Sequence, residues 1–462
     1  MPAPLALSRK TVGCAVARHP LATVFVLALV IRLINAALLR GGDAFFAEAD
    51  ALGYWALGAA LAKPNSFWAT LWSVTDRMPL YPVLLAALYK IFGDLPRAVA
   101  LLQALIDAGT CTLIAALGAL VSPLVGLVAG ILAAVSLTLI VFSTQILTDT
   151  VFLFFLTAML LAGARFLRRP TIGLALVTGI AGGLALATRP AVAALLVVAV
   201  PVVFAVCVVN RRGLGTSLAA AALFAIAAAA PVAPLLLRNA IAYRSFSLTT
   251  QTGAHLAYWI VPLVKERADA TPYQATVDRI EARYWQRLQE RGANEEANPF
   301  RIAELKREVA REEMAKLPLK AFALAWLEGM AINLGAPALI ADPRARALPR
   351  PSFYNTPGGG LWEKARSYLF ADPGLYQLLL IAGLVAMLPF LALEAIGFVM
   401  LARTLPWAAA FAAGVIGYFL LVSGPVASAK YRMPMEPVLI VLAAIPLAWL
   451  VQRTKPMRVG VT

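Results

Sequence analysis

Long apolar stretches dominate this sequence and alternate with short polar segments. A helix needs about 20 apolar residues to cross the roughly 30 Å hydrocarbon core of a bilayer. Stretches of about that length predict an all-α polytopic membrane protein with about ten membrane-spanning helices. They cover residues 21–40, 98–119, 124–142, 150–167, 171–187, 190–209, 215–237, 375–400, 405–423 and 434–452.

Two further apolar segments do not fit as simple spans. Residues 78–92 are short and are interrupted by two prolines and Lys90, and residues 319–334 contain Glu328. If either segment crossed the membrane, basic clusters further along the chain would move to the outer side. We therefore expect both segments to lie on the outer membrane surface as interfacial helices.

Basic residues predict the orientation, because cytoplasmic loops are enriched in Lys and Arg. On the ten-span map, the loops on the side of the N-terminus carry basic residues, apart from the turn at Ser122 and Pro123, which carries none. We therefore expect a multi-pass protein of a bacterial-type inner membrane, with both termini in the cytoplasm. The residues concerned are Arg9, Lys10, Arg18, Arg168, Arg169, Arg211, Arg212, Arg403, Arg453, Lys455 and Arg458.

The same map predicts three parts of the chain. From Lys265 to Lys316 the sequence is rich in Glu, Arg, Lys, Gln and Ala, which is typical of solvated helices with ion pairs along their faces. The parts are an N-terminal transmembrane module (1–237) with a first outer loop (41–97), a periplasmic segment (238–374) and C-terminal transmembrane helices (375–462).

Composition supports a membrane protein and narrows the partners. Apolar residues make up 61% of the 462 residues and charged residues only 14%, which is more apolar surface than one soluble core can bury. The formal net charge of +16 would suggest nucleic acid in a soluble protein. Here the basic residues lie at helix ends without an interleaved aromatic stripe, so we expect membrane lipids and phosphate groups as partners and no nucleic acid. The three cysteines have no metal-ligand spacing, and no metal or other cofactor is indicated.

Two acidic residues on the predicted outer side are candidates for chemistry. Asp50 follows the first span and shares a helical face with Tyr54, so its carboxylate is placed to act as a general base on a hydroxyl group. The alternative is a solvated loop acid or a helix cap. Asp149 lies between two spans, where it either caps the following helix or takes part in the chemistry.

Cationic residues recur on the same side of the predicted membrane. A guanidinium group binds phosphate oxygens through paired hydrogen bonds, and a few such groups could hold the anionic head of a lipid carrier. Extension of a long side chain toward lipid headgroups would explain any single one equally well. Within the first span, Arg32 is expected to pair inside the bundle. The candidates on the outer side are Arg77, Arg189, Arg238, Lys430 and Arg432.

Together these motifs resemble glycosyltransferase family 39. These enzymes are GT-C membrane glycosyltransferases related to protein O-mannosyltransferases and to the lipid A aminoarabinose transferase. The resemblance covers most of the chain and is weakest between residues 265 and 372. Its motifs are Asp50 with Tyr54, Arg-x-Pro-Leu-Tyr-Pro at 77–82, the outer acid Asp149, Pro234-x-x-x-Arg238-Asn239, Thr250-x-Thr252-Gly253 and Lys430-Tyr431-Arg432-Met433-Pro434.

The resemblance implies a GT-C fold and an inverting transfer of a sugar from a polyprenyl phosphate to an acceptor at the outer membrane face. It implies that Asp50 and Asp149 are the two loop acids and that Arg77 and Arg238 bind the carrier phosphate. Some relatives have two adjacent acids in the first loop, whereas here Ala51 follows Asp50. The remaining candidate substrate contacts are Tyr54, Tyr81, Arg189, His255, Tyr258, Lys430 and Arg432.

The sequence thus predicts a glycosyltransferase with an envelope lipid, glycan or protein as acceptor. One alternative is a transporter or flippase of lipid-linked saccharides, which would need polar residues along a path through the bundle. Another is a membrane scaffold without catalytic activity. Few charges fall within the predicted spans, of which Arg32 and Asp107 are the clearest, and this favours chemistry at the membrane surface.

Overall fold

The computed structural model describes residues 19–291, 298–353, 356–358 and 361–454, and these residues form helices without any strand. The all-α polytopic fold predicted from the apolar pattern is confirmed. Five of the basic residues used for the orientation, Arg9, Lys10, Arg18, Lys455 and Arg458, lie outside this range. Seven of the predicted spans are long and apolar enough to cross a membrane: α2 (Pro20–Leu38), α6 (Pro96–Gly118), α9 (Asp149–Arg168), η2 with α11 (Pro190–Val209), α21 (Leu375–Thr404), α22 (Pro406–Ser423) and η5 with α23 (Ala429–Arg453).

The other three predicted spans are shorter or bent. The apolar stretch 124–142 is broken at Ser136 into α7 (Pro123–Val135) and α8 (Leu137–Phe142). The stretch 171–187 forms α10 (Ile172–Thr188). The stretch 215–237 forms α12 (Leu214–Ala229) and α13 (Ala233–Tyr243), which are bent by 64° around Pro231, where the backbone lacks a donor for helical hydrogen bonding.

The two segments expected at the membrane surface also depart from simple spans. The segment 78–92 forms α5 (Leu80–Phe92), whose 13 residues are too few to cross the hydrocarbon core. The segment 319–334 forms α18 (Leu319–Gly335), which is bent by 113° from the polar helix α17 (Pro299–Met314) before it.

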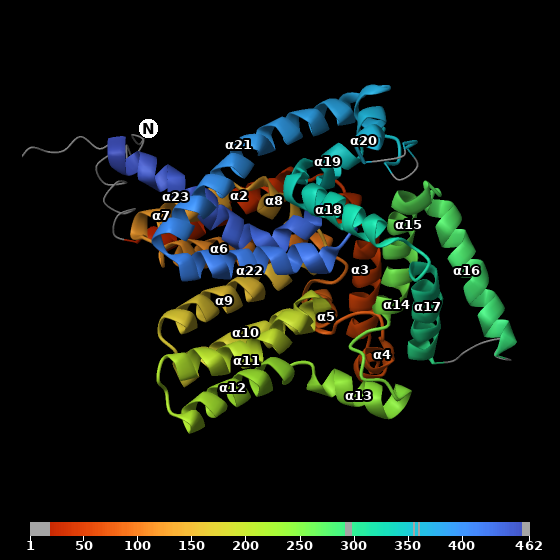
Figure 1. Cartoon of the computed structure of the whole chain (residues 1–462), viewed down its shortest axis with the longest axis horizontal. Helices are drawn as coiled ribbons and strands as arrows, with labels where there is room; N and C mark the ends of the chain where they lie inside the picture. The colour runs from red at the N-terminus through yellow and green to blue at the C-terminus, as the bar shows by residue number, and fades with distance from the viewer. Residues whose placement is uncertain (1–18, 292–297, 354–355, 359–360, 455–462) are drawn as a thin grey trace, which may run out of the picture.

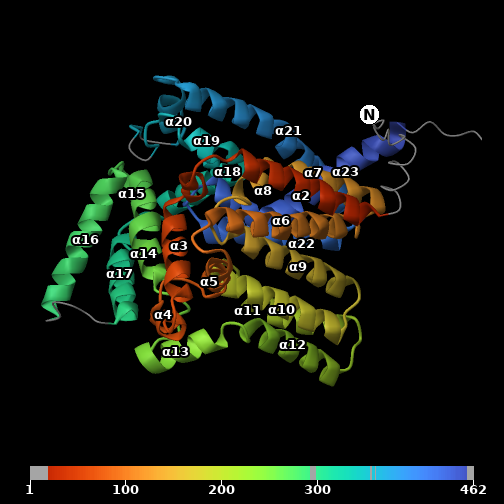
Figure 2. The same cartoon turned by 180° about the vertical axis from the view of Figure 1, so that it is seen from behind.

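The bundle has two distinct ends (Figure 1). The connections α9–α10, α11–α12 and α21–α22, which carry the predicted cytoplasmic arginines, lie together at one end with the first described residues of the chain. At the other end lie α3 (Ala49–Ala62), α4 (Phe67–Ser73), α14 (Gln251–His255) and α16 (Tyr273–Glu290) (Figures 1 and 2). The sidedness of the basic residues therefore agrees with the predicted map.

The described residues of the polar segment between Lys265 and Lys316, 265–291 and 298–316, are mostly helical, as predicted. Its main elements are α15 (Val261–Asp269), α16 and α17. Some ion pairs follow one helix, as predicted, such as that of Lys265 with Asp269 in α15. Others join α16 to α17: Arg287 lies 2.9 Å from Glu312, and Arg291 lies 2.7 Å from Glu308. These contacts hold two amphipathic helices side by side outside the bundle.

Further short helices connect these parts. They are η1 (Gly42–Phe46), η3 (Leu256–Ile260), η4 (Ala338–Ala341), α19 (Pro343–Arg346) and α20 (Leu361–Phe370).

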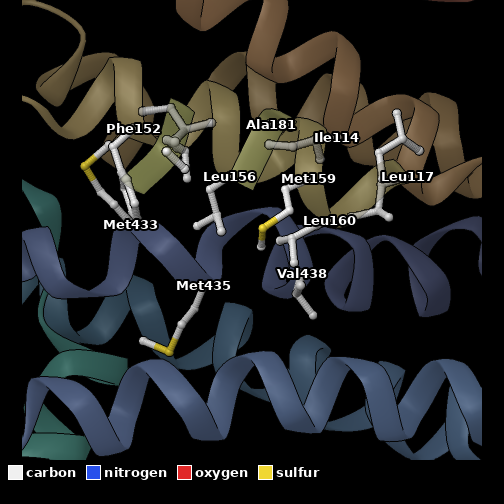
Figure 3. Packing of buried hydrophobic residues seen from close by; sticks show 14 of the residues in the cluster. Ile114, Leu117, Phe152, Leu156, Met159, Leu160, Ala181, Met433, Met435 and Val438 are labelled. Atoms are coloured by element: carbon white, nitrogen blue, oxygen red, sulfur yellow. The ribbon is translucent and has the colours of Figure 1, made fainter. Parts of the chain in front are cut away.

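The apolar core of the bundle lies largely between α6, α9 and α23. Phe152, Leu156 and Leu160 of α9 face Met433 and Val438 of the last span (Figure 3). Small residues let the helices approach closely, as is common in membranes. A Cβ atom at Gly397 in α21 would lie only 1.9 Å from the Leu442 carbonyl oxygen of α23, so this crossing tolerates only glycine.

Arg32 of α2 forms a fully buried ion pair in this core. Its Nε lies 2.6 Å from Asp107 Oδ2 of α6, and both side chains are almost completely excluded from the surface. The guanidinium also donates to the carbonyl oxygens of Ala133 (3.0 Å) and Ala134 where α7 ends. The prediction that Arg32 pairs inside the bundle is confirmed, and the contact ties three helices together.

We predict that Arg32→Ala destabilises the protein by about 3 to 5 kcal/mol, because it leaves the Asp107 carboxylate buried without a counter-charge. The midpoint of thermal unfolding in detergent would report the loss. The double variant Arg32→Met with Asp107→Leu should recover most of the stability, since no charge then remains to be desolvated. A double variant as unstable as Arg32→Ala would show that the pair itself is not the cause.

Candidate functional site

Asp50 lies in the first turn of α3, at the outer end of the bundle. A carboxylate is favourable there because the first turn presents unpaired N–H groups and the positive end of the helix dipole. Its side chain is 50% exposed, and Oδ1 lies 3.1 Å from Nη2 of Arg77. The same arginine lies 3.8 Å from Asp76, which the sequence did not single out. Asp50 is therefore a fixed carboxylate that remains open to solvent.

Tyr54 lies one turn after Asp50 and contacts the same arginine. The Arg77 guanidinium lies 5.0 Å from the centre of the Tyr54 ring, and the ring packs edge-on against Tyr81 at 5.4 Å. Burial raises the pKa of Tyr54, and the positive charges of Arg77 and Arg189 act in the opposite direction. The Tyr54 hydroxyl group thus interacts electrostatically with both arginines, and it remains protonated at neutral pH.

A second acid–arginine pair lies beside the first. Asp149 begins α9 and is 4% exposed, and it forms an ion pair with Arg189 at the end of α10. Arg189 also lies 5.9 Å from the ring centres of Phe152 and Tyr431. The Asp149 carboxylate is thus held by an arginine from another helix, and its part in the chemistry stays a prediction.

Lys430 adds a cation that is not neutralised. It lies in η5 (Ala429–Met435), and its Nζ is 5.7 Å from the ring centre of Tyr431. No carboxylate of the described residues pairs with it. Because Arg189 contacts the same ring, Tyr431 lies near two positively charged groups and belongs to the site, although it was not among the candidate substrate contacts.

Tyr81 packs against Tyr54 from the buried side of the site. It is fully buried, and its hydroxyl donates to Oε1 of Gln103 (3.0 Å) in α6. Gln103 donates in turn to the carbonyl oxygens of Ser143 (3.0 Å) and Gln145 (2.7 Å), just before Asp149. Burial raises the pKa of Tyr81 well above its ordinary value, so it stays a hydrogen-bond donor. Its role here is to join the two acidic loops rather than to face a substrate.

Arg346 of α19 fixes the start of α3 from a distant part of the chain. Its guanidinium donates to the Ala47 carbonyl oxygen (2.6 Å) and lies 2.7 Å from the carboxylate of Glu48, the residue before α3. Sequence reasoning missed this contact because about 300 residues separate the partners. The Glu48 carboxylate therefore forms an ion pair with Arg346, whereas the Asp50 carboxylate, two residues later, does not contact Arg346.

Arg238 does not join the two ion pairs, and its expected contact with the carrier phosphate stays a prediction. It is 2% exposed, and its Nη1 donates to the carbonyl oxygens of Leu71 (3.2 Å), Trp72 (3.1 Å) and Val74 (2.6 Å). The remaining donors bind the Asn239 side chain. Arg238 therefore holds the end of α4, the segment that leads to Arg77.

Arg432 is likewise enclosed in the protein. It is 3% exposed and forms ion pairs with Glu436 (2.8 Å) and with Glu394 of α21, and it donates to the Leu334 carbonyl oxygen. Two carboxylates neutralise this one cation, so its structural role is to join α18, α21 and α23. Arg432 was predicted to contact the substrate. Its side chain is almost completely buried in this structure, and that contact stays a prediction.

His255 and Tyr258 lie in α14 and η3, which pack on α17 in the outer segment. Burial lowers the pKa of His255 and raises the pKa of Tyr258 to about 12. Within the described part of the chain, no hydrogen bond joins either side chain to the two ion pairs. Their predicted contact with substrate remains a prediction.

The described residues contain no group of three His, Cys, Asp or Glu side chains that could hold a metal ion. The expectation that no metal is required stays a prediction, because a substrate phosphate can itself supply ligands.

We predict that Arg238→Ala loosens the end of α4 and lowers the free energy of unfolding by about 1 to 3 kcal/mol, the cost of buried carbonyl groups left without a donor. Arg238→Lys should recover little, since one ammonium group cannot reproduce the fork of donors. Thermal unfolding measures the effect, and Arg244→Ala, on an exposed residue of the following turn, is the control. Normal stability combined with weaker binding of a lipid-linked donor would instead restore the role expected from the sequence.

Residues 76–236 match the family model described as dolichyl-phosphate-mannose-protein mannosyltransferase. Two structures of ArnT from Cupriavidus metallidurans, one bound to undecaprenyl phosphate and one in the apo state, are 14% and 13% identical to this chain. Each match covers 93% of this chain and 78% of that one, with TM-scores of 0.37 and 0.36, too low to transfer any feature. No curated protein matches the sequence. The family match confirms the resemblance expected from the motifs: over residues 76–236 the chain is similar to the GT-C membrane glycosyltransferases of family 39.

Proposed function

We propose that this chain is an inverting glycosyltransferase that moves one sugar from a polyprenyl-phosphate donor to a lipid, glycan or protein of the cell envelope. The reaction would take place at the periplasmic face of a bacterial inner membrane. One observation carries the proposal: a half-exposed carboxylate, Asp50, is held by Arg77 beside a second acid–arginine pair at the end of the bundle opposite the basic loops. The family match supports the reaction class.

Asp50 is the better candidate for the general base because a base must reach the hydroxyl proton that it removes. Its carboxylate is 50% exposed, whereas that of Asp149 is 5% exposed and paired with Arg189. Asp149 would position Arg189 and, through it, the ring of Tyr431. The two acids therefore have different tasks in this proposal.

The carrier phosphate requires cations that can face it. Arg77 and Arg189 are each about one-fifth exposed, and Lys430 has no carboxylate partner among the described residues. Charged donors in a partly dehydrated site stabilise the charge that develops on a leaving phosphate. We assign this role to Arg77, Arg189 and Lys430 and leave Arg238 out of it.

The step is a single displacement. The acceptor oxygen forms a bond to the anomeric carbon while the bond from that carbon to the phosphate oxygen breaks, which inverts the configuration. The acceptor proton passes to Asp50, and the polyprenyl phosphate leaves with the bonding electron pair.

A transporter of lipid-linked saccharides is less well supported. The charges buried within the spans are paired with one another, Arg32 with Asp107 and Arg432 with Glu394 and Glu436. Such pairs stabilise helix contacts, and their charged groups are not available to bind a polar solute that moves through the bundle.

The proposal is tested by incubating the purified protein with labelled polyprenyl-phosphate sugars and extracted envelope lipids, glycans or proteins. Label should move from the carrier to an acceptor, and the new bond should have the inverted configuration. Label that reaches no acceptor, but crosses the bilayer on its carrier in proteoliposomes, would support the transporter instead.

We predict that Asp50→Asn lowers the turnover number about 10²- to 10⁴-fold, the usual contribution of a general base, with donor binding largely retained. The matched control is Asp43→Asn, because Asp43 is exposed and lies in the same loop. Glu48→Gln is a poorer control, since it would break the contact with Arg346. Near-normal transfer by Asp50→Asn would remove Asp50 from the role of base.

We predict that Lys430→Gln raises the KM for the lipid-linked donor about tenfold or more, the value of one hydrogen bond to a charged group. Lys63→Gln removes the same charge from an exposed outer position and should have little effect. Steady-state kinetics with varied donor distinguishes the two. An unchanged donor KM with a changed acceptor KM would assign Lys430 to the acceptor.

A further inference from the structure

A polar recess of about 490 Å³ lies in the outer segment, away from the two acid–arginine pairs. It is formed by α15, α16, the end of α17 and the turn that leads into α18. Neither the family match nor the proposed reaction assigns a role to it. The charged side chains that line it are Lys265, Asp269, Arg279, Arg283, Glu313 and Lys316.

Positive charge exceeds negative charge in this recess, with four cations against two carboxylates. Lys265 pairs with Asp269 at 2.6 Å, while Arg283 and Lys316 share the single carboxylate of Glu313. Glu312 lies 3.8 Å from Arg283, but it is paired more closely with Arg287. Arg279 is exposed, and no ion pair is formed by it in the described part of the chain. The recess therefore offers an anion at least one arginine that is not neutralised.

The two carboxylates, Asp269 and Glu313, carry their negative charges at neutral pH. Burial acts to raise the pKa of Asp269 and of Glu313, but hydrogen bonds from Lys265 and Lys316 outweigh it and hold both pKa values below their ordinary range. Both groups are therefore ionised at neutral pH, and the excess of cations remains.

The recess borders an apolar surface. Leu317 and Pro318 form its edge and lead directly into α18, which exposes Leu319 (83%) and Leu327 (62%). An apolar helix that exposes leucines next to a cationic recess matches the boundary between lipid tails and headgroups. A ligand here would have an anionic head and an apolar part.

We propose that this recess binds the phosphate-bearing headgroup of an anionic lipid in the outer leaflet, with Arg279 and Lys316 as its main contacts. The site is separate from the proposed donor site, because α18 lies between them. The far end of α18 binds the segment before Lys430: Asn333 donates to the Val426 carbonyl oxygen at 3.1 Å. Its 17 residues span roughly 25 Å, so one phosphate group cannot occupy both places.

The test is lipid binding by the purified full-length protein, measured by native mass spectrometry in detergent. Phosphatidylglycerol and phosphatidylcholine are titrated in parallel. Arg279→Gln should weaken binding of phosphatidylglycerol about tenfold, the equivalent of one hydrogen bond to a charged group, and leave phosphatidylcholine unaffected. Arg301→Gln is the matched control, since it removes the same charge from an exposed position of α17 outside the recess. The difference between the variants separates the recess from other lipid contacts.

Equal binding of phosphatidylglycerol by the two variants would overturn the proposal, as would equal sensitivity of phosphatidylcholine to Arg279→Gln. A third arm titrates inorganic phosphate against bound phosphatidylglycerol. Displacement at similar concentrations would show a site for free phosphate and also overturn the lipid assignment. Because the readout is binding, it is independent of the proposed sugar transfer, and Arg279→Gln should retain whatever transfer activity the unmodified protein has.

Discussion

The apolar surroundings of the bundle require that its buried charges be paired, and the arrangement of the helices follows from these pairs. Arg32 with Asp107 joins α2 to α6, and Arg432 with Glu394 and Glu436 joins the last spans to α21. An isolated charge in such a setting costs several kcal/mol, so each pair fixes the register of the helices that it connects. Asp50, Arg77 and Lys430 take no part in these buried pairs and lie at the outer end.

The site is assembled from segments that are far apart in the chain and are held by side chains that bind the backbone. Arg238 binds the carbonyl groups before Arg77, Gln103 binds those before Asp149, and Arg346 binds the one before α3. Each contact joins the end of one short element to another helix. The charged groups of the site can therefore keep their relative positions even though they lie on connecting segments and helix ends.

Hydrophobicity along the sequence was enough to predict most spans and the side on which the candidate residues would lie, because apolar length and the placement of basic residues are local properties. The break at Ser136 and the bend around Pro231 were not predicted, since both lie inside continuous apolar stretches. The partners of Arg238 and Arg432 were not predicted for a related reason. An arginine near a membrane surface looks the same in a sequence whether its partners are carbonyl groups, carboxylates or a substrate phosphate, and those partners come from distant helices.

The unequal exposure of the two acid–arginine pairs determines which acid accepts the proton in the proposed mechanism. Asp149 is buried and paired with Arg189, and the proposed mechanism leaves that pair in place. Asp50 is open, and on the proposed mechanism it becomes neutral when it accepts the acceptor proton. Arg77 then loses its main counter-charge at the stage when negative charge accumulates on the leaving phosphate. One proton transfer would thus both activate the nucleophile and release a guanidinium group toward the leaving group, and Asp76, at 3.8 Å, is the only other carboxylate that Arg77 contacts within the described residues.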